Sequence, residues 1–251
     1  MLRDIAIALG FILVACLAMA LPAAWMQRRH GALQPSDTRD LARDVAQRLG
    51  VMHGLILGLV FGQVLGNAAQ LRDSIELEAA AVEQVHHRAA EYGAPGVQRA
   101  ALDYLDAVVR HDWPDMEGGR SLSDAGWRAW RALSAQTLAL RPADRTQQVL
   151  ADAMQQAVWR IEDMRQARGF QVGVRLPYEF WFAAIAGLVL IGAVFFIHAP
   201  TRKHLAIAAA YSSYTGILLY MIFDLSHPFG GFLTLSPDAF HQSLAALRAG
   251  P

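Results

Sequence analysis

The amino-acid sequence predicts an all-α integral membrane protein with four transmembrane helices and an extramembrane helical bundle inserted between the second and the third. The chain has 251 residues, of which 54% are hydrophobic and only 18% are charged. Soluble domains are roughly 45 to 50% apolar and about one quarter charged. The apolar residues also form four blocks, and a long polar stretch, residues 70–176, separates the second block from the third.

The first predicted span runs from Ile5 to Trp25 and contains no charged side chain. About 20 apolar residues are enough for a helix to cross the hydrocarbon core, and Trp25 is placed as an interfacial anchor. A cleaved signal peptide is the alternative, with a small-residue site at Ala18–Ala20 or a lipoprotein-type box at Leu13–Cys16. Because the apolar run continues past both sites, we expect an uncleaved span. Cys16 is the only cysteine, which excludes an internal disulfide.

The other three spans are also defined by charge-poor apolar runs. The second and fourth contain no Asp, Glu, Lys or Arg, and Pro177 is well placed to begin the third as a first-turn proline. Only Ala199–Lys203 separates the third span from the fourth, so these two are expected to form a tight antiparallel hairpin. The predicted spans are Leu49–Ala68, Tyr178–Ala199 and His204–Phe223.

The orientation in the membrane is left open by the charges. The linker Met26–Arg48 carries five arginines, and the hairpin carries Arg202 and Lys203. The positive-inside rule would place these segments in the cytoplasm, and the bundle on the other side. The flanks of the bundle, however, also carry arginines, namely Arg72, Arg165, Arg168 and Arg175.

The polar stretch is divided by glycines and prolines into four helical segments. The first, Asn67–Tyr92, has no breaker where it leaves the second span, so one helix is expected to continue from the span into the bundle. Residues three and four apart predict the buried faces of the first and last segments. These faces are Leu71, Ile75, Glu78, Val82, Val85, Ala89 and Tyr92, and Leu150, Met154, Ala157, Ile161 and Met164; Trp113, Trp127, Trp130 and Trp159 are expected in the core.

The second span carries a glycine at every fourth position: Gly50, Gly54, Gly58, Gly62 and Gly66. Such a ridge of small residues lets another membrane helix approach closely, so we expect helix packing here, with a direct role in a permeation path as the alternative. His53, Phe61, Gln63 and Asn67 lie away from the ridge and are candidates to line an aqueous route.

Two carboxylates occupy positions that call for a partner. Glu78 lies on a predicted buried face, where an isolated charge is costly, so we expect a structural ion pair with Arg160 or Arg165, or else a functional role. Asp224 ends the fourth span and His227 follows it. Ionisable groups at membrane depth are candidates for function, although an edge position also lets a side chain reach water.

Several classes of function are excluded. The 22 basic and 22 acidic residues give no net charge, which argues against binding to nucleic acid. Glu83 and His86 form only half of a metal-binding helix motif, and His87 points elsewhere, so no metal site and no cofactor are expected. Metal binding at Glu83 and His86 is kept as a third, weaker alternative. A glycine-rich phosphate loop and a nucleophile with a suitable partner are both missing, so the chain is not expected to be an enzyme.

Short motifs occur along most of the chain: Gly54–Asn67, Glu78–Ala81, Tyr104–Pro114, Arg165, Arg168, His227–Gly231 with the motif residues Pro228, Phe229 and Gly231, and Leu235–Pro237. Together these motifs resemble the bestrophin-like family of bacterial and plant membrane proteins, which is distantly related to bestrophin anion channels. One departure is that Ser226 and His227 stand where the family usually has an acidic residue before the Pro-Phe pair.

The resemblance implies a ring of subunits, commonly five, around a pore whose apolar neck is formed by the second span. Ile56, Val60, Phe61 and Val64 are then the neck candidates, and the bundle lies in the cytoplasm. The expected function is an oligomeric channel for small ions, namely anions, in a bacterial inner membrane. The alternative is a non-conducting membrane sensor or scaffold whose bundle binds a ligand or partner. The expected domains are residues 1–69, 70–176 and 177–251.

Overall fold

The computed structural model describes residues 2–31, 36–173, 175–197 and 201–249, and every regular element in these ranges is a helix. Four of the helices are long and apolar enough to cross a membrane, judged by length and composition. The predicted fold class is therefore confirmed. The chain divides into two compact units, one made of Met1–Gly66 with Arg175–Ser226 and one made of Asn67–Val174 with His227–Pro251.

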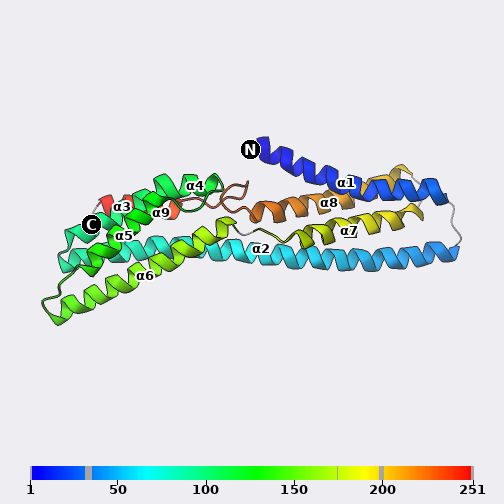
Figure 1. The fold of residues 1–251 in the computed structure, drawn as a ribbon. Helices are drawn as coiled ribbons and strands as arrows, with labels where there is room; N and C mark the ends of the chain where they lie inside the picture. Colours follow the sequence, from blue (N-terminus) through cyan, green and yellow to red (C-terminus); the bar gives the residue numbers. More distant parts are fainter. Residues whose placement is uncertain (1, 32–35, 174, 198–200, 250–251) are drawn as a thin grey trace. The chain divides into compact units, whose positions relative to one another are not determined.

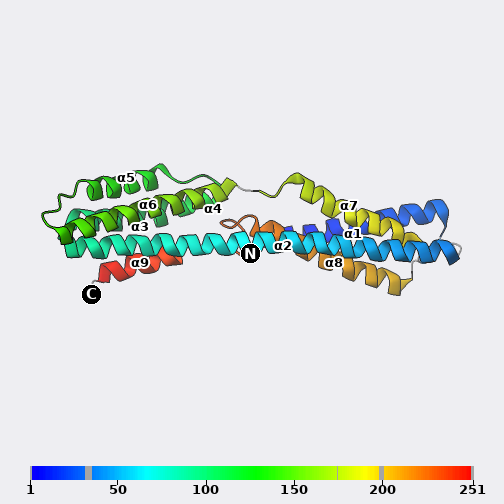
Figure 2. The same ribbon diagram turned by 90° about the horizontal axis from the view of Figure 1, so that it is seen from below.

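The first unit contains the apolar helices. They are α1 (Leu2–His30), the first part of α2 (Ser36–Tyr92), α7 (Tyr178–Val194) with the short 3₁₀ turn η2 (Phe195–Ile197), and α8 (Arg202–Leu225). Figures 1 and 2 show α1, α7 and α8 side by side. Glycines allow this close approach, because a Cβ on Gly216 would lie 2.6 Å from the Cα of Ile12, and one on Gly192 would collide with the backbone of Met19.

The two helices that contain the first and second spans are longer than predicted. Helix α1 continues to His30 and α2 begins at Ser36, so most of the linker expected at Met26–Arg48 is helical. Both helices continue through the arginines of this segment, because residues 26–30 and 36–48 contain no glycine or proline that would end a helix. The predicted end of the third span, at Ala199 and Pro200, lies outside the described residues.

The second unit is the helical bundle. It contains the rest of α2, α3 (Pro95–Ala107), the π-helix η1 (Val108–Asp112), α4 (Trp113–Glu117), α5 (Asp124–Leu138), α6 (Arg145–Gly173) and α9 (Asp238–Ala249). Helix α2 runs without a break from the predicted span into the bundle, as expected. It ends at Tyr92, Gly93 follows with a left-handed φ of 81°, and Pro95 then begins α3.

The core of the bundle follows the predicted face of α2. Six of the seven residues of that face are buried, and Tyr92 is half-buried. Trp113 is buried as expected and Trp127 and Trp130 are half-buried, but the prediction for Trp159 is wrong because 53% of its side chain is exposed. Helix α9 was not predicted, and its Phe240 is fully buried in the same core.

Candidate functional site

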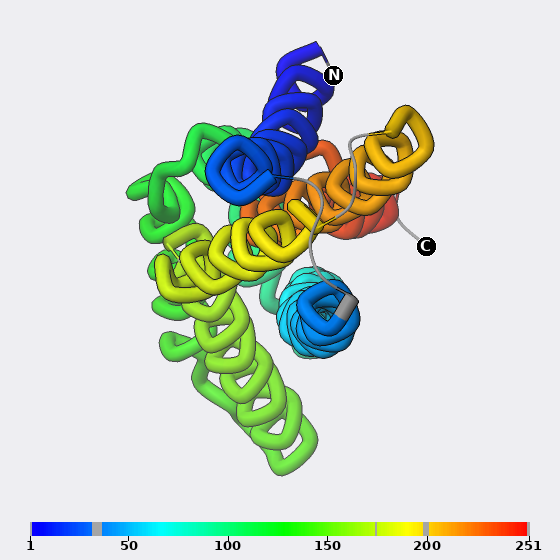
Figure 3. The backbone as a smooth tube through the Cα atoms, turned by 90° about the vertical axis from the view of Figure 1, so that its right-hand side faces the viewer, coloured from blue at the N-terminus to red at the C-terminus, as the bar shows by residue number. Residues whose placement is uncertain are grey.

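The first candidate site is the side of α2 that carries the glycine ridge. A Cβ built on Gly50, Gly54, Gly58, Gly62 or Gly66 would meet no atom within 4 Å. Figure 3 shows α2 nearly end-on, with α1, α7 and α8 all lying to one side of it. Within the described part of the first unit, no other helix therefore covers the ridge.

Another side of α2 packs against the chain's own helices. His53, Leu57 and Val64 are buried there, and Leu57 belongs to a cluster with Ala184 and Leu188 of α7. The four predicted neck residues do not share one environment. Ile56 is 40% exposed, Val60 and Phe61 are half-buried and Val64 is only 4% exposed.

His53 joins α2 to α7 and α8. Its Nε2 donates a hydrogen bond to the carbonyl oxygen of Ala184 (2.9 Å), and its Nδ1 lies 3.5 Å from the hydroxyl of Tyr211. A carbonyl oxygen only accepts, so the proton sits on Nε2 and Nδ1 is free to accept from the tyrosine. Gly187 makes room for the ring, because a Cβ there would collide with it. His53 is thus buried at a helix contact, and does not line an aqueous route within this chain.

The second candidate site is a buried network of two carboxylates and two guanidinium groups in the bundle. Arg168 of α6 donates two hydrogen bonds to Glu78 of α2, from Nε to Oε2 (3.1 Å) and from Nη2 to Oε1 (2.9 Å). Tyr104 of α3 also donates to Oε1, at 2.5 Å. Both charged side chains have no exposed surface, so the fork of the arginine replaces water around the carboxylate.

Asp112 forms the other half of this network. Arg165 binds it through both terminal nitrogens, with Nη2 3.1 Å from Oδ1, and Nη2 of Arg168 lies 3.5 Å from Oδ2. Ser123 donates to Oδ1 from its backbone N–H (3.0 Å) and its hydroxyl (2.7 Å). The network, defined here as Glu78, Asp112, Arg165 and Arg168, has no net formal charge.

A local distortion of the helix presents Asp112 to the network. Asp112 is the last residue of the π-helix η1, where the backbone N–H of Trp113 bonds to the carbonyl of Val108, five residues back. Pro114 follows at once, and a proline has no N–H to continue the usual ladder. Single π turns of this kind often occur at functional sites.

Aromatic rings enclose the two arginines. The guanidinium of Arg165 lies 4.8 Å from the ring centre of Trp127, and that of Arg168 lies 5.4 Å from the ring centre of Phe240. Burial disfavours the charged form of Arg168, but the interactions with Glu78, Tyr104 and Asp112 together outweigh it, so the pKa of Arg168 is raised. Burial, and then the charge of Glu78, raises the pKa of Tyr104 well above its usual value.

The expected ion pair of Glu78 has a different partner from those predicted. Arg160 instead donates to Gln84 at the surface, and Arg165 binds Asp112. The spacing of buried residues on α6 explains the error. The buried face continues in steps of four and three through the arginines and bypasses the half-buried Met164: Met154, Val158, Ile161, Arg165 and Arg168. Two arginines continuing an apolar face were the sequence signal for this network.

The family motif anchors the C-terminal segment to the bundle. Phe229 is 3% exposed, and its ring meets Trp113 edge to face at 5.5 Å between ring centres. The backbone of Pro228 accepts a hydrogen bond from the N–H of Leu235 (2.8 Å), which closes the loop containing Gly231. Asp224, 4% exposed, lies in the last turn of α8, and His227 follows in the loop and is half-buried.

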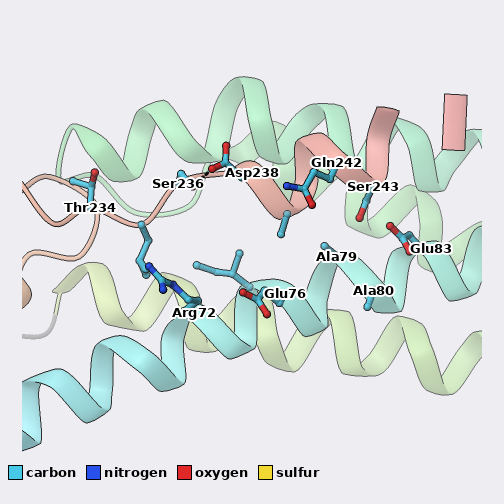
Figure 4. Close-up of a pocket in the computed structure, with 13 residues that line it drawn as sticks. Arg72, Glu76, Ala79, Ala80, Glu83, Thr234, Ser236, Asp238, Gln242 and Ser243 are labelled. Atoms are coloured by element: carbon cyan, nitrogen blue, oxygen red, sulfur yellow. Dashed lines mark hydrogen bonds between the residues drawn. The ribbon is translucent and has the colours of Figure 1, made fainter. Parts of the chain in front are cut away.

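A polar pocket of about 500 Å³ lies between α2 and the segment leading into α9. Figure 4 shows Arg72 and Glu76 on α2, with Ser236 and Asp238 across the pocket. Glu83 also lines it. His86 is half-buried and His87 exposed, and in the ranges that the structure describes no three His, Cys, Asp or Glu side chains group as metal ligands.

These features define an all-helical, multi-pass membrane protein with a polar helical bundle. A family model described as the bestrophin-like domain matches residues 11–240, so the chain belongs to the bestrophin-like family and the resemblance is confirmed. A search of curated proteins finds no significant match.

Solved structures show the same fold. A point-mutant crystal structure of a bacterial bestrophin homologue from Klebsiella pneumoniae matches with a TM-score of 0.66 at 14% identity, covering 99% of this chain and 100% of that one. A structure of the Klebsiella homologue phased with zinc gives 0.65 at 12% identity, covering 96% and 95%. A mutant described only as a membrane protein gives 0.67 at 11% identity, covering 99% and 98%.

Proposed function

We propose that this bestrophin-like membrane protein assembles into a ring of identical subunits and conducts small anions along the second span. The observation that carries the proposal is the uncovered side of α2. From Leu49 to Leu71 this helix has no Asp, Glu, Lys or Arg, and its glycine ridge meets no other part of the described chain. A ridge of small residues is suited to close contact with a helix of a neighbouring subunit.

The burial pattern reduces the number of residues that could form the proposed neck. Val64 is buried against the chain's own helices, whereas Ile56 lies on the uncovered side, beside exposed Leu59 and Gln63. Residues three and four apart share a helix face, so these three form one stripe next to the glycine ridge. In a ring, the ridge would contact the neighbour and this stripe would face the axis, where Ile56 and Leu59 form an apolar constriction that gates by dewetting.

The test is conductance of the purified protein in planar bilayers. We expect wild-type currents carried mainly by chloride, and Ile56→Thr should raise the current because a polar side chain keeps the constriction wet. Ile207→Thr is the matched control, since Ile207 is 61% exposed on α8 and should not reach the pore. Folded, multi-subunit protein without current, or equal effects of the two substitutions, would contradict the proposal.

The polar pocket beside α9 favours a second function, a non-conducting sensor or scaffold. The pocket has a volume of about 500 Å³, which is large enough for a small ligand. Its lining includes Arg72, Glu76, Glu83 and Asp238. This alternative needs no shared pore and predicts one or two chains per particle. Native mass spectrometry distinguishes the two proposed functions, because a particle of one or two chains cannot form a ring around a shared pore.

A further inference from the structure

An apolar groove of about 430 Å³ lies between α1 and α8 in the first unit. Small and aliphatic side chains form its walls: Ala20, Ala23 and Ala24 on α1, and Leu205, Ala208 and Ala209 on α8. Both helices are predicted membrane spans, so the groove lies in the part of the chain that contacts lipid. Alanines leave space between the helices that larger residues would fill.

The groove runs from Cys16 and Ser212 at one end to polar side chains at the other. At the first end the Sγ of Cys16 lies 3.3 Å from the hydroxyl oxygen of Ser212. Gln27 and His204 line the other end. From Cys16 to Gln27 a helix rises about 16 Å, which is about half of a hydrocarbon core of roughly 30 Å. The groove therefore has the length of one leaflet.

Aromatic and basic residues mark the polar end as the headgroup level. The guanidinium of Arg29 lies 5.2 Å from the ring centre of Trp25, and both residue types are typical of the membrane interface. Arg28, Arg202 and Lys203 are exposed at the same ends of α1 and α8. Residues 5–36 and 180–223 contain no Asp or Glu, so no acidic residue of these stretches offsets the positive charge.

We propose that this groove binds one acyl chain of an anionic phospholipid, with the headgroup phosphate at the basic end. The apolar walls match the acyl chain in length and polarity, and the four basic side chains favour a lipid with net negative charge over a zwitterionic one. This binding does not depend on ion conduction, so it holds for a channel and for a sensor alike.

Native mass spectrometry of the full-length protein in detergent tests the proposal. Phosphatidylglycerol and phosphatidylcholine with identical acyl chains are added to delipidated protein. We expect about one phosphatidylglycerol per chain, bound at least about tenfold more tightly than phosphatidylcholine. The double change Arg202→Gln with Lys203→Gln should remove most of this preference without abolishing the binding of phosphatidylcholine.

Filling the groove should weaken both lipids. Ala208→Phe is expected to lower affinity about tenfold or more, because the ring replaces several methylenes of the acyl chain. Ala206→Phe is the matched control, since Ala206 is exposed on the same helix and does not line the groove. Ala23→Phe, with Leu21→Phe as its control, repeats the test from α1 if the first variant does not fold.

Two results would overturn the proposal. One is equal binding of the two lipids to the wild-type protein, which would remove the role of the basic end. The other is an equal loss of binding in groove and control variants, which would place the lipid elsewhere on the surface.

Discussion

Asp112 connects the π-helix η1 to helix α6 and to the start of α5. Its carboxylate accepts from Arg165 of α6 and from Ser123, whose hydroxyl in turn accepts from the N–H of Gly126 (2.9 Å) and so begins α5. One carboxylate thus fixes the start of a helix and compensates a buried cation. Buried ion pairs contribute little net stability when intact, but loss of one partner is costly.

The tight packing at Gly126 leads to the first prediction. A Cβ there would collide with the carboxylate of Asp112 and with Nη2 of Arg165, so Gly126→Ala should destabilise the bundle by about 2–4 kcal/mol. Thermal unfolding followed by circular dichroism measures this. Gly173→Ala is the control, because a Cβ on Gly173 meets nothing within 4 Å; a Gly126→Ala protein as stable as this control would refute the collision.

The pair of Glu78 and Arg168 gives the second prediction. Arg168→Gln leaves Glu78 buried with one partner fewer and should cost about 3–5 kcal/mol. Glu78→Gln combined with Arg168→Gln should cost less than the sum of the two single changes, because neither charge is then left alone. Arg160→Gln, at the surface, should change stability by less than about 0.5 kcal/mol. Additive single effects would show that the two side chains do not interact.

Because the pKa of Tyr104 is raised, the stability of the folded protein should decrease at alkaline pH. In the unfolded chain a tyrosine ionises near pH 10, whereas the buried Tyr104 keeps its proton. The unfolded state therefore releases a proton that the folded state holds, so this contribution to stability is complete below about pH 10 and declines above it, by at most about 1.4 kcal/mol per pH unit. Tyr104→Phe should flatten the decline in a titration of the melting temperature. An equally steep decline in that variant would show that Tyr104 ionises in the folded protein.

At the scale of elements, α2 has two sides with different requirements. On one side His53 and Leu57 need the chain's own α7, and Gly187 must stay small to accept the histidine ring. On the other side the glycines meet nothing in the described chain. Substitutions on the first side should affect folding of the subunit, and those on the second should affect only assembly.

The glycine ridge supplies the corresponding prediction. Gly58→Leu and Gly62→Leu should leave the helical content of the subunit unchanged and reduce the number of chains per particle, because a bulky side chain prevents close helix contact. Native mass spectrometry measures the particle against the chain mass of 27.5 kDa. Gly10→Leu in α1 is the control, as its Cβ also meets nothing within 4 Å. An unchanged particle mass would argue that the ridge faces lipid.

At the scale of the whole molecule, the sequence predicted the spans and the buried face of α2 well. The bilayer demands about 20 apolar residues for each helix, and a helix repeats every 3.6 residues, so both signals are local. The partner of Glu78 was missed because pairing between α2 and α6 depends on how two helices distant in sequence align. Helix α9 was missed because its buried face rests on few apolar residues, mainly Phe240, Leu244 and Leu247.

The second unit is built from two separate segments of the chain, and this predicts which fragments fold in water. It needs His227–Pro251 as well as Asn67–Val174, since Phe229 and Phe240 cover Trp113. The predicted domain 70–176 alone should therefore aggregate or remain loosely packed. A polypeptide joining 67–173 to 227–249 through a flexible linker should be soluble and cooperatively folded. Near-ultraviolet circular dichroism compares the two, and a well-packed 70–176 piece would contradict this division.

The balance of the buried network also constrains how the sequence can change over generations. Replacing any one of Glu78, Asp112, Arg165 or Arg168 leaves an uncompensated charge without water around it. A replacement by apolar residues is tolerated only when a carboxylate and its arginine change together. Single substitutions are therefore selected against at these four positions, although Glu78 and Arg168 lie ninety residues apart in the chain. A related sequence that lacks these charges must have changed a carboxylate and its arginine together.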